Sequence, residues 1–284
     1  MAKEFRSTIA ISAAPANPPL ATHKLFDSSY VEFTGSPVDE FTIRIRTVNK
    51  LSPQPASFDA YQGQLVLLGT VAAVESFLRA VFRRAISIDP ICQEKASKKD
   101  VSYAAALHLT VDLLPEALLE RISFTSFDNI EKALKELLGV SGELPADVKS
   151  VIDDYVKVCH LRHCAVHRFG KLGASNAVHL GLLEHKVLLE KPLILDYIAL
   201  QNAIAIATAF VRTLNGFLFN VLISRLPDGY FSGSYGTDRG RFLVYYRMFA
   251  DRASSSKSAA PRFIYADFQK ERAKHLANLH KAKK

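Results

Sequence analysis

The sequence predicts a mainly α-helical protein, because two long stretches repeat their apolar residues at the 3.6-residue period of an α-helix. These stretches are residues 57–87 and 193–222. A shorter helical pattern begins at Pro145 and leads into residues 159–170, the densest group of reactive side chains in the chain. Long apolar helices bury their faces most readily against one another. We therefore expect a helical bundle over residues 58–225.

The two ends of the chain differ in character from this body. Residues 1–57 are expected to form an N-terminal extension, because six prolines interrupt them. Within it, residues 40–48 alternate apolar and polar side chains, which predicts a half-buried strand, and residues 30–33 are its candidate partner strand. Residues 226–284 are expected to form a C-terminal tail.

Local signals place the other elements of the bundle. Ser57 is the expected N-cap of the first long helix. Further helices are expected over residues 102–114 and 127–138, and Ser126 can cap the second of these. Residues 178–189 fit either short strands or an irregular loop, so their structure stays open.

The net charge of +8 is concentrated in the tail, which holds twelve basic and five acidic residues. Such a tail suggests a polyanion partner, most simply RNA, although a solubilising role fits the charge equally well. Residues 242–249 are mainly aromatic and are expected to pack as a strand or helix rather than to stack on bases. Residues 253–260 read as a linker, and residues 266–284 as a basic surface helix.

The composition favours a cytoplasmic protein. Its three cysteines, Cys92, Cys159 and Cys164, form no CxxC pair, which suits a reducing compartment better than a disulfide framework. No uninterrupted apolar run reaches the ~18 residues of a membrane span, and the N-terminus lacks a signal-peptide core. We expect no membrane contact.

Three interpretations compete for residues 159–170. The basic side chains can stabilise the end of a helix. Alternatively, His163 and His167 have the i, i+4 spacing of metal ligands, but no HExxH or CxxC pattern accompanies them. The third interpretation is metal-free acid–base chemistry on a phosphodiester. In it a histidine moves the proton and an arginine, Arg162, binds the phosphate.

Arg162 and His167 would converge poorly if one helix continued through both. Five residues separate them by ~140° around an ideal helix. They would meet more readily if the helix ended between them, or if a second copy supplied the missing group. Upstream, Glu75 lies among apolar residues, and it either pairs with Arg79 or points inward to orient an active-site group.

The segment Arg162-His-Cys-Ala-Val-His167 resembles the R-x4-6-H motif of the HEPN superfamily. The order of helices is also similar to that family: a long helix carrying Glu75, then the motif at the end of a later helix, then another long apolar helix. The resemblance spans about residues 58–223 and is closest in style to HEPN proteins of bacterial defence and toxin systems.

The resemblance implies a homodimeric endoribonuclease that needs no metal or cofactor and leaves a 2′,3′-cyclic phosphate. It makes His167 the general acid/base, Arg162 the phosphate-binding group and His163 an orienting group, with Glu75 in the acidic position of the early helix. It implies a role as a toxin or in antiviral defence, with an antitoxin or sensor as a possible partner. The alternative is a non-catalytic interaction module that binds nucleic acid.

Overall fold

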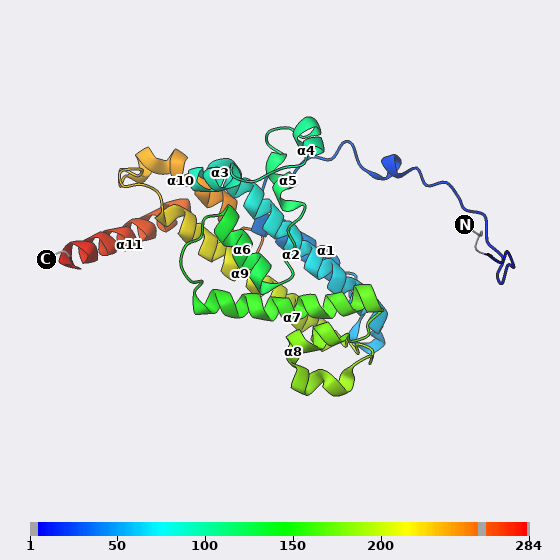
Figure 1. Cartoon of the computed structure of the whole chain (residues 1–284). Coiled ribbons are helices and arrows are strands. Elements are labelled where there is room, and N and C mark those ends of the chain that lie inside the picture. The colour runs from blue at the N-terminus through cyan, green and yellow to red at the C-terminus, as the bar shows by residue number, and fades with distance from the viewer. Residues whose placement is uncertain (1–4, 255–259, 283–284) are drawn as a thin grey trace. The chain divides into compact units, whose positions relative to one another are not determined.

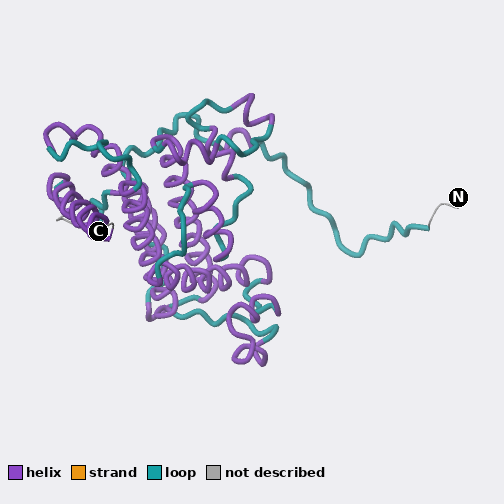
Figure 2. Tube along the Cα trace, turned by 60° about the vertical axis from the view of Figure 1, so that its left-hand side comes forward, coloured by secondary structure: helices purple, strands orange, loops and turns teal. Residues whose placement is uncertain are grey.

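The computed structural model describes residues 5–254 and 260–282. By its internal contacts the chain divides into two units, Met1–Thr34 and Gly35–Lys284. The described part of the first unit is exposed loop with one 3-10 turn, Thr22–Leu25. The second unit holds the α-helices, and no strand occurs among the described residues (Figure 2). The mainly α-helical fold predicted from the sequence is confirmed.

The helices follow one another through short connections. Their bounds are α1 Pro37–Asn49, α2 Ala60–Ile88, α3 Pro90–Ala96, α4 Tyr103–His108, α5 Leu114–Leu119, α6 Phe127–Leu137, α7 Ala146–Arg168, α8 Ala174–His185, α9 Tyr197–Ser224, α10 Tyr235–Phe249 and α11 Pro261–Ala282.

The core lies where the three longest helices of the bundle meet. α2 packs on α9, and α7 packs across both of them (Figure 1). Tyr155 on α7 stacks on Phe210 of α9 with ring centroids 4.5 Å apart, and both side chains are fully buried. The apolar faces of residues 57–87 and 193–222 therefore do meet, as their periodicity predicted.

The strand predicted for residues 40–48 is wrong, because this segment lies in α1. Ser36 caps the helix by accepting a hydrogen bond from the Asp39 backbone N–H, and Pro37 occupies the first turn, where a proline is tolerated. α1 packs closely on α2, since a Cβ on Gly69 would come within 2.9 Å of Val48. Residues 30–33 lie in a loop, so the partner strand is wrong too.

Three further boundaries differ from expectation. Asp59, not Ser57, caps α2 by accepting from the Gln62 backbone N–H. The helix expected over residues 102–114 is two short helices, α4 and α5, joined by a turn. Residues 178–189, left open between strand and loop, are helical through most of α8 and a following 3-10 turn.

The tail folds onto the bundle through α10. Residues 242–249 belong to this helix, and Phe242, Tyr245 and Phe249 are buried, which confirms the packed interpretation of the aromatic run. Residues 266–282 are helical within α11, as expected. Part of the expected linker, residues 255–259, lies outside the described residues, as do the last two lysines.

Two helices, α2 and α9, are long and apolar enough to cross a membrane by length and composition alone. In their most apolar windows, 61% and 44% of the residues are buried inside the fold. Core helices of soluble proteins pass the same test, so this is weak grounds for a membrane span.

Candidate functional site

The reactive cluster occupies the last turns of α7, which continues as one helix to Arg168. Phe169 then adopts a left-handed conformation with φ 51°, and Gly170 follows with φ 88°. The Gly170 N–H donates to the Cys164 carbonyl at 3.0 Å, which closes the helix end. The helix therefore continues through the cluster and does not end between Arg162 and His167.

Arg162 lies at the edge of the core. It shares a face of α7 with Tyr155 and Cys159, at the i, i+4, i+7 spacing. Its side chain is half-buried, and within the described chain it makes no hydrogen bond or ion pair. A guanidinium in this position is available for an anion from outside the chain.

Glu75 on α2 is close to the same face of α7. Burial, helped by the nearby Glu75 carboxylate, raises the pKa of the Cys159 thiol to about 12, against the opposing effects of the Tyr155 hydroxyl and of Arg162. Glu75 is half-buried. The expected alternative partner, Arg79, instead pairs with Glu116 at 3.1 Å. Glu75 and Arg162 therefore both lie close to Cys159, and Arg79 is engaged by Glu116 rather than by Glu75.

His163 and His167 form a pair on the exposed side of the helix. Their rings lie 4.4 Å apart at 45°, one turn from each other. Partial burial, and after it the charge of His167, lowers the pKa of His163. A histidine whose neutral form is favoured is available to accept a proton near neutral pH.

His160 belongs to a separate contact with α8. Its ring stacks on His179 at 4.6 Å, and its Nδ1 lies 3.1 Å from the Asn176 Oδ1. Burial lowers the pKa of His160, and the charge of His179 adds to this. These contacts give His160 a packing role between α7 and α8.

Arg162 and His167 do not converge within one chain. Because α7 is continuous through both, their side chains leave the helix ~140° apart. Arg162 thus lies near Cys159, as Glu75 does, whereas His167 pairs with His163 on the exposed side of the helix. A site that uses both groups on one phosphate needs a contribution from outside this chain.

Exposed apolar side chains surround this end of the bundle. Tyr61 and Leu65 on α2 lie beside α7, and the Tyr61 ring contacts that of Phe169 at 5.3 Å. Phe169 is 76% exposed and Val166 is 43% exposed. Exposed apolar side chains gathered near one helix end are typical of an interaction site.

The segment 171–192, which includes α8, extends this apolar surface. Leu172 exchanges backbone hydrogen bonds with Glu190 and Lys191, and Arg168 pairs with Glu190 at 2.5 Å. The exposed apolar side chains of the segment 171–192 are Val178, Leu182, Leu183, Val187 and Leu188. Sequence reasoning missed this surface; its only signal was an apolar stretch without a buried helical face.

The other interpretations of the cluster have less support. Among the described residues, no group of three or more His, Cys, Asp or Glu side chains is placed to hold a metal ion. His167 and Arg168 do lie in the last turn of α7, where positive charge is favourable. The helix dipole explains why basic residues are tolerated in the last turn of α7. It does not require Arg162 or the contact between His163 and His167.

Comparison with known proteins adds no assignment: no protein-family model, curated protein or solved structure matches this chain. The function must therefore be argued from the residues themselves.

The histidines predict a loss of stability on mild acidification. Because the pKa values of His160 and His163 are lowered in the folded protein, the unfolded chain binds protons first as the pH falls through about 6.5. The free energy of unfolding should therefore decrease between pH 7.5 and 5.5 in urea titrations. The double variant His160→Asn/His163→Asn should show a smaller decrease than the wild type. The control is His108→Asn, at an exposed position of α4, which should show the same decrease as the wild type. An equal decrease in all three proteins would contradict the prediction.

Proposed function

We propose that this protein is a metal-independent endoribonuclease of HEPN type that acts as a homodimer in antiviral defence or as a toxin. The observation that carries the proposal is the guanidinium of Arg162, which has no hydrogen bond or ion pair among the described residues and lies on the same helix end as the exposed His163–His167 pair. A histidine can move the proton and an arginine can stabilise the phosphate charge, so together they can cleave a phosphodiester without metal.

The chemistry assigns a role to each group. His167 takes the proton from a ribose 2′-OH, whose oxygen attacks the adjacent phosphorus. The bond to the 5′-oxygen breaks, that oxygen takes up a proton from water, and a 2′,3′-cyclic phosphate remains. Arg162 holds the phosphate and offsets the charge that develops on it. Glu75 and His163 orient Arg162 and His167 respectively.

A second copy supplies what one chain lacks. The Arg162 and His167 side chains of one chain point apart, so Arg162 of one copy would act with the partner subunit's His167. Burial of the exposed apolar surface of α7 and α8 would stabilise this pairing at ~25 cal/mol per Å². An isologous contact between identical surfaces closes as a dimer.

The tail supports an RNA substrate. α11 carries exposed basic side chains at Arg262, Lys270 and Lys274. These can contact phosphates without reading sequence, and such contacts weaken as salt is raised. An antitoxin or sensor partner, and the cytoplasmic location, stay predictions.

The competing proposal is a non-catalytic interaction module. It is favoured by the divergence of Arg162 and His167 within one chain and by the large exposed apolar surface. The two proposals differ in one outcome, which is whether the protein cuts RNA.

Cleavage in the presence of EDTA tests the proposal. The full chain should cut a fluorophore-quencher RNA oligonucleotide in EDTA, and mass spectrometry should find 2′,3′-cyclic phosphate ends. The same oligonucleotide with 2′-deoxy sugars should stay intact, because it lacks the attacking hydroxyl. The double variant Arg162→Ala/His167→Ala, purified identically, should be inactive. Equal activity of the wild type and the double variant would overturn the proposal, and inactivity of both would favour the interaction module.

A further inference from the structure

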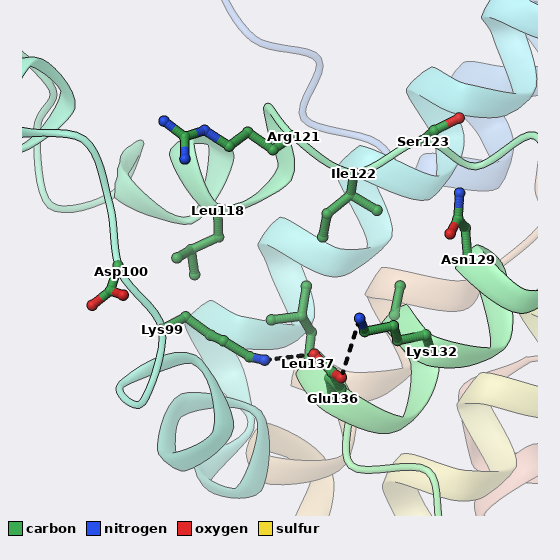
Figure 3. A pocket seen from close by; sticks show the side chains of 11 residues that line it. Lys99, Asp100, Leu118, Arg121, Ile122, Ser123, Asn129, Lys132, Glu136 and Leu137 are labelled. Atoms are coloured by element: carbon green, nitrogen blue, oxygen red, sulfur yellow. Dashed lines mark hydrogen bonds and ion pairs between the residues drawn. The ribbon is translucent and has the colours of Figure 1, made fainter.

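A cavity lies away from the cluster on α7. Its volume is about 430 Å³, and it is bounded by α5, α6 and the segment that follows α3 (Figure 3). None of its lining residues belongs to α7 or α8. This volume is within the range of small-molecule sites in proteins.

The floor of the cavity is apolar. Leu118 of α5 and Ile122 meet Ala133 and Leu137, which are one turn apart on α6. Ala133 and Leu137 are buried, and Leu118 and Ile122 are half-buried. Such a floor favours a flat apolar body over water or a bare ion.

The rim is basic. Lys99, Arg121 and Lys132 carry positive charge, against Glu136 and Asp100. Glu136 lies between two of the cations, 2.5 Å from Lys99 and 3.9 Å from Lys132, and Figure 3 shows both lysines directed at it. The lysines therefore share one carboxylate, and the rim holds an excess of positive charge.

Two rim groups keep unused hydrogen-bonding capacity. The guanidinium of Arg121 and the side-chain amide of Asn129 have no hydrogen-bond partner within residues 5–254 and 260–282. Both belong to the cavity and flank its apolar floor in Figure 3. An arginine with no internal carboxylate suits a phosphate or carboxylate oxygen of a ligand.

We propose that this cavity binds a small organic anion, with one or two flat rings and a single phosphate or carboxylate group. The rings would lie on Leu118, Ile122 and Leu137, and the anionic group would contact Arg121 and Lys132. The inference does not depend on the ribonuclease proposal, because the two sets of residues do not overlap.

Calorimetric titration of the full chain with matched probes tests the site. We expect 2-naphthyl phosphate or 2-naphthoate to bind at one site per chain, and the tighter of the two identifies the anionic group. Neutral 2-naphthol should bind at least about tenfold more weakly, because it lacks the charge-assisted hydrogen bonds. Arg121→Glu and Lys132→Glu should each weaken anion binding by about tenfold or more. The control is Lys50→Glu, an exposed lysine at the end of α1, which should not change it.

Methyl NMR of Ile122 locates the probe. Its resonances should shift on addition of the anion, and circular dichroism should show that both charge variants remain helical. Binding that is equal for 2-naphthol and the anions would overturn the proposal. So would unchanged affinity in a folded charge variant, absence of binding, or an unshifted Ile122 methyl.

Discussion

Alanine in place of Arg162 or His167 is expected to lower the rate of RNA cleavage by at least about a hundredfold. His167 is exposed and Arg162 makes no hydrogen bond or ion pair within the described chain, so neither substitution should unfold the protein. Arg168→Ala and His185→Ala are the matched controls, because both residues are basic and lie in the last turns of α7 and of the neighbouring α8. Each control should retain most of the activity in a single-turnover assay with EDTA.

Mixing the two inactive variants should restore cleavage. If Arg162 of one copy acts with the partner subunit's His167, a heterodimer of Arg162→Ala and His167→Ala keeps one intact pair. A site confined to one chain would stay inactive in every combination. Random exchange puts about half of the dimers in the mixed form, so recovery well above either variant alone is expected.

The exposed apolar surface provides the control for this experiment. Leu183 is 84% exposed on α8 and has no packing role to lose. Introducing Leu183→Glu into both variants should prevent their pairing, because a carboxylate would be buried in an apolar contact. Sedimentation should then find a monomer, and mixing should give no activity. Recovery of cleavage from monomers would contradict a composite site.

The sequence was sufficient for the helices that build the core, because burial imposes a 3.6-residue period on one face. α2, α7 and α9 were found this way. α1 was not found, because residues 40–48 are too short a segment to separate the two-residue period of a strand from the 3.6-residue period of a helix. Ser36 and Pro37 decide in favour of the helix, because they cap and open α1, which then packs on α2.

The candidate site could be predicted by residue type but not by arrangement. The spacing of Arg162 and His167 is visible in the sequence, whereas the continuity of α7 through both is fixed by the helix end at Phe169 and Gly170. The stacking of His160 on His179 depends on α8, whose helix had no clear period. Tertiary contacts of this kind have no local signature.

A buried ion pair links the ends of three helices. Asp89, which is 1% exposed, accepts hydrogen bonds from the backbone N–H groups of Ile91 and Cys92 at the start of α3. The same carboxylate pairs with Arg225, which follows α9. Arg225 also donates to the Leu138 carbonyl after α6. One guanidinium therefore ties the ends of three helices together.

Removing this guanidinium should be strongly destabilising. Arg225→Met leaves the Asp89 carboxylate buried without its partner, and the expected loss is about 3–5 kcal/mol in the free energy of unfolding. Arg168→Met is the matched control, because its pair with Glu190 is 41% and 59% exposed and should contribute at most about 1 kcal/mol. Urea unfolding followed by circular dichroism measures both. A similar loss of stability in the two variants would contradict the prediction, because the exposed Arg168–Glu190 pair is screened by solvent and the buried Asp89–Arg225 pair is not.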